Sequence, residues 1–391
     1  MCIFSSYRRL LSLPGFGSSL VAAIAGKLQP GIFSLALFLD VMHYRTLSQA
    51  AAVVSVSALA GITVPLRGRL MDQYGYARVM WPALVLYLIA LIGVMLNERA
   101  HGSLIMTVIC ALAAGVSAPP IQIVTRLMWR SIATDDLRTT VLSLDAVLAD
   151  IGFIIGPTLA VILVELVAPW AGLAAAALLS AGATILLLCR RLPHQRHSQR
   201  SVERDWMGPL RSVALRHTMV AAVLFFFAVR AIELALPAWA QEHDSSLMSG
   251  VLLSSMAIGS VIGGLVLGAL PPRWAGRAKL SVTLMALSLG TILAAFATAS
   301  YLSVLVVAAA VMGLALGPSF VSLYTIAGDL SPQNMAVETQ SWISSFMSLG
   351  GAAGAAISGL VFQTFGSGMM LAIAAASIAT ASVPARMAST K

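Results

Sequence analysis

The chain alternates between long apolar stretches and short polar ones over its whole length. Each apolar stretch has roughly 20 residues, the length that an α-helix needs to cross the hydrocarbon core of a bilayer. The pattern predicts twelve spans, and the polar segment from Arg190 to His217 divides them into two sets of six. The predicted spans are residues 17–39, 47–66, 79–97, 103–124, 140–164, 169–189, 218–240, 247–270, 280–299, 301–325, 337–363 and 367–385.

The composition is that of a membrane protein. Of the 391 residues, 59% are hydrophobic and only 10% are charged, whereas soluble domains carry about 25% charged residues. A water-soluble core could not bury so much apolar surface, so the bilayer is the expected solvent. Cys2, Cys110 and Cys189 are far apart and show no metal-ligand spacing. We therefore expect free thiols, no metal site and no cofactor.

The basic residues predict the orientation of the chain in the membrane. With the N-terminus in the cytoplasm, twenty of the 24 Lys and Arg residues fall in inner loops and tails, and only Arg45 and Arg99 fall outside. This is the positive-inside pattern, so we expect a bacterial plasma (inner) membrane protein with both termini in the cytoplasm. The same placement explains the net charge of +9 without a nucleic-acid partner. The Arg-rich central loop is expected to contact anionic membrane lipid.

The two halves of the sequence resemble each other at a nearly constant offset. Such an offset predicts parallel six-span repeats, which form two bundles with a transport pathway between them. The predicted domains are a bundle over 1–189, a cytoplasmic linker over 190–217 and a second bundle over 218–391. Matching positions at an offset of 198 are Pro120 with Pro318, Gly152 with Gly350, and Gly156 with Gly354.

Two local sequences carry a family resemblance. After the second span, Gly68 to Arg78 reads Gly-Arg-Leu-Met-Asp-Gln-Tyr-Gly-Tyr-Ala-Arg, and it resembles the Gly-x-Leu-x-Asp-x-x-Gly-x-x-Arg loop of the major facilitator superfamily. In the fifth span, Gly152-Phe-Ile-Ile-Gly156-Pro157 resembles the Gly-x-x-x-Gly-Pro element of the superfamily's antiporters, the drug exporters among them.

The resemblance extends over nearly the whole chain. Three shorter strings, which begin at Leu144, Glu233 and Ser341, are similar to those of a group of actinobacterial, drug-exporter-like members. The resemblance implies an all-α membrane protein with twelve helices in two six-helix bundles, working as a monomer. It also implies that the third helix of each triplet faces outward, while the others line the cavity or the domain interface.

Ionisable groups inside the spans are the first functional candidates, because each costs at least about 2.5–3.5 kcal/mol at a helix centre. Arg230 and Glu233 in the seventh span are three residues apart, so they share a helix face and can pair. Glu233 is our first candidate for the driving proton, and Asp150 in the fifth span is the second. Lys27 is expected to neutralise Asp150 or to hold an anionic substrate group. The alternatives are static ion pairs and packing hydrogen bonds.

Further candidates fall into three groups. The polar residues Gln29, Gln122 and Tyr324 are candidates for substrate contact, with packing hydrogen bonds as the alternative. The inner-gate group is Gly68, Asp72, Gly75, Arg78, Arg126 and Asp145, whose charges are expected to lock the gate or, alternatively, to form a solvated surface network. The helix-packing and helix-bending group is Pro119, Pro120, Gly152, Gly156, Pro157, Pro318, Gly350 and Gly354.

These observations predict a secondary active transporter that works by alternating access, with proton-coupled efflux of a small molecule. A nucleotide-binding Gly-x-x-x-x-Gly-Lys-Ser/Thr loop does not occur, so we do not expect ATP to drive it. One alternative is a uniporter or an importer of an anionic metabolite, which Lys27 and Arg230 favour. A membrane transferase or a sensor belongs to a different class. The loops lack paired acidic or His motifs and any output domain, so we do not expect an enzyme.

Overall fold

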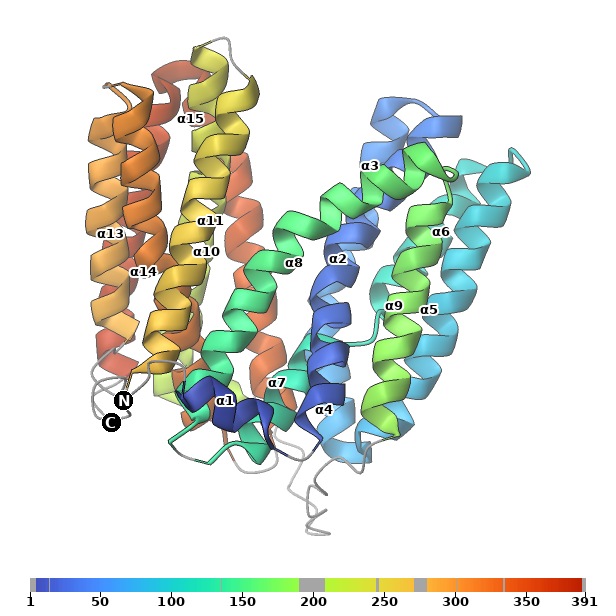
Figure 1. The fold of residues 1–391 in the computed structure, drawn as a ribbon. Coiled ribbons are helices and arrows are strands. Elements are labelled where there is room, and N and C mark those ends of the chain that lie inside the picture. Colours follow the sequence, from blue (N-terminus) through green and yellow to red (C-terminus); the bar gives the residue numbers. More distant parts are fainter. Residues whose placement is uncertain are drawn as a thin grey trace. The chain divides into compact units, whose positions relative to one another are not determined.

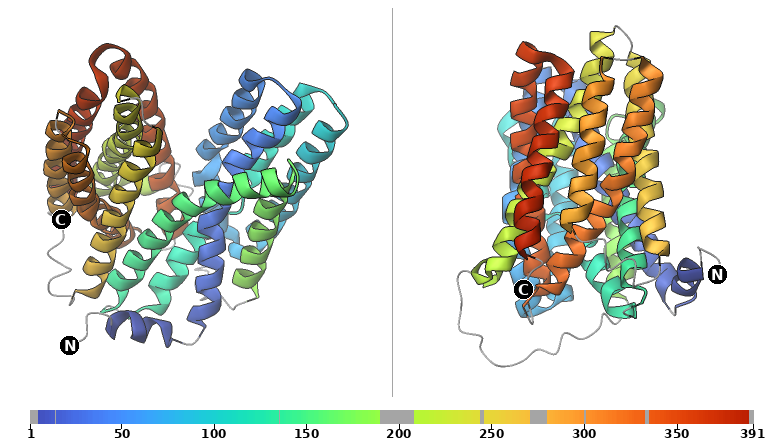
Figure 2. Two further views of the ribbon diagram at one scale, coloured as in Figure 1. Left: turned by 45° about the horizontal axis from the view of Figure 1, so that its top comes forward. Right: turned by 90° about the vertical axis from the view of Figure 1, so that its left-hand side faces the viewer.

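The computed structural model is helical throughout the part of the chain that it describes (Figures 1 and 2). It describes residues 5–13, 15–134, 136–189, 208–243, 246–270, 280–299, 301–332 and 335–388. Cys2 and most of the predicted linker, residues 190–207, lie outside these ranges.

Within the described residues, the first half of the chain forms nine α-helices and one short 3-10 helix. They are α1 (Ser5–Leu11), α2 (Phe16–Tyr44), α3 (Leu47–Leu59), η1 (Ala60–Thr63), α4 (Val64–Tyr74), α5 (Tyr76–Arg99), α6 (Leu104–Ser117), α7 (Ile121–Ile132), α8 (Arg138–Leu166) and α9 (Ala171–Leu188). The described helices of the second half are η2 (Gly208–Arg211), α10 (Val213–Glu242), α11 (Ser246–Ala269), α13 (Leu280–Ala297), α14 (Leu302–Asp329) and α15 (Ala336–Ala388).

Ten segments of the described chain are long and apolar enough to cross a membrane. The twelve predicted spans are nevertheless present. The last two are joined in α15, where Gly366 alone has a non-helical backbone with a φ of 75°. The second predicted span is divided among α3, η1 and α4, each of which is too short to be counted alone. The all-helical, twelve-span fold is therefore confirmed.

Prolines affect the fourth span and its counterpart in the second half differently. Proline has no backbone N–H and crowds the preceding turn, so it breaks or kinks a helix. At Pro119 and Pro120 the helix stops, with α6 ending at Ser117 and α7 beginning at Ile121. Pro318 instead lies within the continuous helix α14, as Pro157 does within α8.

The chain divides into two compact units, each described here by itself. The N unit contains Leu11–Ile132 and Leu148–Ser201, and the C unit contains Met1–Leu10, Ala133–Val147 and Val202–Lys391. The N unit has its core between α2, α3, α5, α6, α8 and α9, and the C unit between α10, α11, α13, α14 and α15. The units therefore differ from the predicted domains in the assignment of two short segments, 1–10 and 133–147.

Both segments have specific contacts within the C unit. The Tyr7 hydroxyl donates a hydrogen bond to the carbonyl oxygen of Leu265 at 3.1 Å. The Thr140 hydroxyl donates to the carbonyl oxygen of Gly268 at 2.6 Å. Nearby, Leu142 of α8 packs against Leu267 of α11 in a small apolar cluster. These bonds explain why α1 and the start of α8 belong with the second-half helices.

Glycines bring the first and fifth spans of each half into backbone contact. In the N unit, a Cβ added at Gly156 would lie 3.2 Å from the carbonyl oxygen of Leu28 on α2. In the C unit, a Cβ added at Gly354 would overlap the carbonyl oxygen of Phe227 on α10. Leu28 and Phe227 are 199 residues apart and the two glycines are 198 apart, so the sequence repeat makes the same helix contact twice.

Candidate functional site

The C unit holds an ion pair within an apolar span. Arg230 and Glu233 both lie on α10, and their Nη1 and Oε2 atoms are 2.8 Å apart. The Arg230 side chain is 43% exposed and that of Glu233 is 18% exposed. The Oε2 atom accepts no well-aligned hydrogen bond, so charge rather than a directed bond holds the pair together. Such a contact is easily opened when one partner changes its charge.

Three aromatic side chains from α10 and α14 pack together about one helical turn from Arg230. Phe320 meets Phe225 edge-on at a centroid distance of 5.0 Å and Phe226 at 5.4 Å. Gly351 lies beside both side chains, because a Cβ there would be in ordinary van der Waals contact, 3.9 Å from the Nε atom of Arg230 and from the ring of Phe226. An aromatic cluster one helical turn from a cation suits ligands that have an apolar body and a charged group.

The start of α15 carries polar atoms that sequence reasoning did not select. Gln340 Oε1, Ser341 Oγ and Trp342 Nε1 are buried and have no hydrogen-bond partner among the described residues. Buried polar atoms are nearly always bonded, so such vacancies call for a ligand, a water or another conformation. Tyr324, a predicted contact residue, reaches the same helix through a 3.5 Å contact of its hydroxyl with Met347 Sδ.

In the N unit, two predicted contact residues are engaged in packing. The Gln29 Nε2 atom donates to the Tyr87 hydroxyl at 2.6 Å, and the Gln122 Nε2 atom donates to the carbonyl oxygen of Gly26 at 3.0 Å. These bonds tie α2 to α5 and α7, which favours the packing alternative for both residues.

Lys27 and Asp150 lie on two helices in close contact. Lys27 is buried in α2, with 5% of its surface exposed. A Cβ at Gly152 of α8 would lie 2.7 Å from the Lys27 carbonyl oxygen. The backbones of α2 and α8 therefore approach closely two residues after Asp150. The structure thus brings the two predicted residues into the same region of the N unit.

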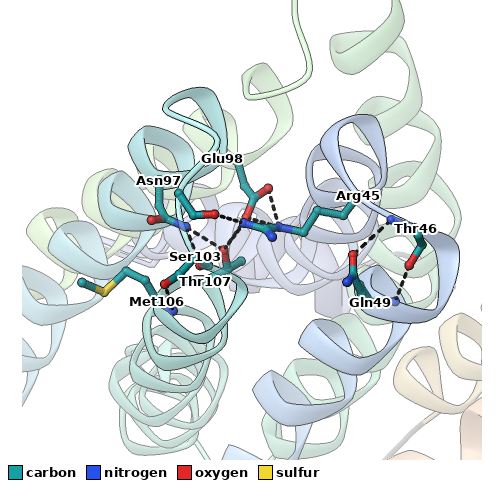
Figure 3. Close-up of polar contacts among 9 residues, drawn as sticks. Arg45, Thr46, Gln49, Asn97, Glu98, Ser103, Met106 and Thr107 are labelled. Carbon is teal, nitrogen blue, oxygen red and sulfur yellow. Dashed lines mark hydrogen bonds and ion pairs between the residues drawn. The ribbon is translucent and has the colours of Figure 1, made fainter.

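A buried charge cluster at one end of the N unit escaped the sequence analysis (Figure 3). The Nε atom of Arg45 lies 2.8 Å from each carboxylate oxygen of Glu98, which is fully buried. Arg45 also donates to the carbonyl oxygen of Gly102 at 2.9 Å. The hydroxyl of Thr107 donates to Glu98 and accepts from Asn97 at 2.9 Å. The cluster ties the end of α2 to α5 and α6.

Asp40 lies near that end of α2 and is also buried. Only 1% of its surface is exposed, and its Oδ2 atom has no hydrogen-bond partner within the described ranges. A buried carboxylate without a partner is costly, so Asp40 is a further candidate for holding a proton. The predicted first span ended at residue 39 and so missed it. The signal was present in the sequence, since Asp40 and Arg45 follow the first predicted span and Glu98 follows the third. These two spans run in the same direction, so both end on the same side of the membrane.

The predicted inner-gate residues are distributed between the two units. The turn between α4 and α5 is made at Gly75, whose φ of 86° favours glycine. Arg126 is buried on α7 in the N unit. Asp145 is buried on the part of α8 that belongs to the C unit. The joint cluster with Asp72 and Arg78 stays a prediction.

The family profile of the Major Facilitator Superfamily matches residues 15–355. The chain belongs to the major facilitator superfamily. The resemblance carried by Gly68–Arg78 and Gly152–Pro157 is thus confirmed at the level of the family. The chain is an integral membrane protein with the fold of this family of transporters.

Solved structures of the superfamily match this fold at low sequence identity. The E. coli fucose:proton symporter is 14% identical with a TM-score of 0.77, over 95% of this chain and 98% of that one. The human organic anion transporter MFSD10 is 15% identical with a TM-score of 0.75, over 95% and 99%. A bacterial homologue of the iron transporter ferroportin is 15% identical with a TM-score of 0.74, over 96% and 99%. No curated protein matches the sequence.

Proposed function

We propose that this superfamily member is a secondary active transporter that exports a small molecule by alternating access in exchange for protons. The supporting observation is the ion pair of Arg230 and Glu233 near the middle of the 30-residue helix α10. A half-exposed charge at that depth is stable only beside water or a ligand, because contact with lipid costs at least about 2.5–3.5 kcal/mol. This pair therefore marks the transport pathway.

Glu233 carries the driving proton in this proposal. When Glu233 is ionised, it holds Arg230. When it takes up a proton, the pair loses its attraction, and Arg230 becomes available to a substrate or to another carboxylate. A proton drives the cycle only if its affinity differs between the outward-open and inward-open states. A pair that is made in one state and broken in the other provides that difference.

Export is supported by the Gly152–Pro157 element on α8, which resembles that of the superfamily's antiporters. Gly152 and Gly156 place α8 against α2 at backbone distance. We place the protein in the bacterial inner membrane with both termini in the cytoplasm, because the basic residues favour that side.

A second candidate is uniport or import of an anionic metabolite. It is favoured by Lys27, which is buried in the N unit, and by the exposure of Arg230 in the C unit. The similar structures include both a proton symporter and an organic anion transporter, so the fold is compatible with either mode.

The two candidates can be separated in everted membrane vesicles that hold an acidic interior. A panel of lipophilic cations, organic anions and sugars is added while a pH-sensitive dye reports the gradient. Proton-coupled export predicts that at least one compound dissipates the gradient in wild-type vesicles and fails to do so with Glu233→Gln. Equilibration of an organic anion across the vesicle membrane, at a rate that is unaffected by collapse of the pH gradient, would instead establish uniport.

A further inference from the structure

A cavity of about 510 Å³ lies in the N unit where the turn between α4 and α5 meets the end of α6. Among the described residues, none of the proton and substrate candidates lines it, and Arg78 is the one residue of the predicted inner-gate group in its lining. Its walls include Arg67, Tyr74 and Arg78 at one end and Pro82, Ala83 and Leu86 along α5. It therefore has one polar, cationic end and one apolar side.

The arginines at the cationic end have hydrogen-bond donors without acceptors. Arg67 donates from Nη1 to the carbonyl oxygen of Ala118, but its buried Nε atom has no acceptor among the described residues. Arg78 is exposed and forms no hydrogen bond or ion pair within the described part of the chain. No acidic residue lines the cavity. Two guanidinium groups without a carboxylate favour an anion with several oxygen atoms, such as a phosphate.

The apolar side continues along α5, away from the arginines. Arg78 and Leu86 are eight residues apart, which is about 12 Å along an α-helix. Leu86 is 48% exposed, and its neighbours Val85 and Ile89 are exposed as well. Exposed aliphatic residues on a membrane span are suited to contact with lipid chains. The occupant must therefore be anionic at one end and apolar along its length, which a small soluble anion is not.

We propose that this cavity binds an anionic phospholipid, with its phosphate between Arg67 and Arg78 and an acyl chain along Pro82, Ala83 and Leu86. The excess of basic residues assigns this end of α5 to the cytoplasmic leaflet. Because Arg78 ends the Gly68–Arg78 turn, the lipid holds that turn at the membrane surface. The binding is independent of the direction of transport and of its coupling ion.

The first test compares lipid adducts on the purified protein by native mass spectrometry. Wild-type protein should retain one phosphatidylglycerol in preference to phosphatidylethanolamine. Arg67→Gln and Arg78→Gln should each lower this preference roughly five-fold, the factor that corresponds to about 1 kcal/mol for a basic residue near an anionic surface. Arg78 is exposed, so Arg78→Gln should fold normally. The proposal therefore stays testable even if Arg67→Gln unfolds.

The matched control for charge is Arg8→Gln, which removes an exposed arginine of α1 outside the cavity and should leave the preference unchanged. Equal loss with Arg8→Gln, or an unchanged preference with Arg78→Gln, would overturn the proposal.

A second pair of variants separates a lipid from a free phosphate. Leu86→Trp fills the apolar wall and leaves both arginines in place, so it should abolish the retained phosphatidylglycerol. Ile89→Trp changes an exposed residue of the same helix outside the cavity and should not. If Leu86→Trp retains the lipid, or if inorganic phosphate displaces it from wild-type protein, the site recognises the phosphate group alone and the proposal is wrong.

Discussion

At the residue scale, the polar side chains of the spans differ in whether their donors and acceptors have hydrogen-bond partners. Gln29 and Gln122 use their amide groups to join neighbouring helices, so they act in packing. Glu233 and Asp40 each have a buried carboxylate oxygen without a directed hydrogen bond. Buried carboxylate oxygens without hydrogen-bond partners destabilise the fold. A role of these carboxyls in proton transfer during transport explains their presence.

Asp40 and Glu98 are expected to respond differently to neutralisation. Glu98→Gln breaks the buried pair with Arg45 and leaves a guanidinium without its counterion, which costs about 3–5 kcal/mol. Asp40→Asn removes a charge from a buried side chain that has no such partner, so it should unfold at the wild-type temperature or above. Thermal unfolding of the two variants in detergent measures this. An equal loss of stability in both would mean that Asp40 is ionised and held by a partner.

At the element scale, glycine contacts decide how closely the helices approach. A Cβ at Gly354 overlaps the backbone of α10, whereas a Cβ at Gly359 on the same helix α15 meets nothing within 4 Å. The sequence repeat predicted the first position as a packing glycine. The repeat could not distinguish Gly354 from Gly359, because the distance of each glycine from α10 depends on the rotation of α15 about its axis.

Gly354→Ala should therefore destabilise the protein by about 1–3 kcal/mol, the usual range for overpacking, while Gly359→Ala should have little effect. The comparison requires only thermal unfolding midpoints for the two variants and wild type. A destabilised Gly359→Ala beside an unaffected Gly354→Ala would contradict the observed α10–α15 contact.

The short helix α1 offers a test that depends on pH. Arg9 of α1 pairs with Asp136 at 2.9 Å. A hydrogen bond from the Thr134 hydroxyl, together with the charge of Arg9, lowers the pKa of Asp136 below its usual value of 3.8. The pair is therefore fully present above that value and is lost as the pH falls through the lowered pKa.

A nitroxide label at the exposed residue Leu11 should report this loss. Its mobility should rise only in acid for wild-type protein, whereas Asp136→Asn should show high mobility at neutral pH already. A label that is equally immobile in Asp136→Asn at neutral pH would show that the pair does not hold α1.

At the scale of the whole molecule, the sequence predicted the spans because membrane insertion depends on local composition. Twenty apolar residues cross a bilayer whatever they later contact. Burial at span ends and the grouping of helices depend on tertiary packing, so the burial of Asp40 and the placement of 133–147 in the C unit could not be predicted in this way. The cavity at Arg67 and Arg78 could not be predicted for the same reason, because its walls come from three helices, α4, α5 and α6.

The topology is testable at the same scale. A cysteine at the exposed position Ala100 should react with a membrane-impermeant maleimide added to intact cells, because the basic residues place that loop outside. A cysteine at the exposed position Arg216 should react only after the membrane is opened. Labelling of position 216 in intact cells would overturn the orientation.

The central claim is that a proton on Glu233 drives uphill export. The most direct measurement compares pH-driven accumulation with downhill exchange in proteoliposomes, using a compound identified in the vesicle screen. Glu233→Gln mimics the permanently protonated form, so it should abolish accumulation and keep exchange near the wild-type rate. Glu165→Gln, an exposed carboxyl at the end of α8, should retain both activities. Accumulation by Glu233→Gln at the wild-type level would contradict the account and leave Asp150 and Asp40 as the carboxyls to test.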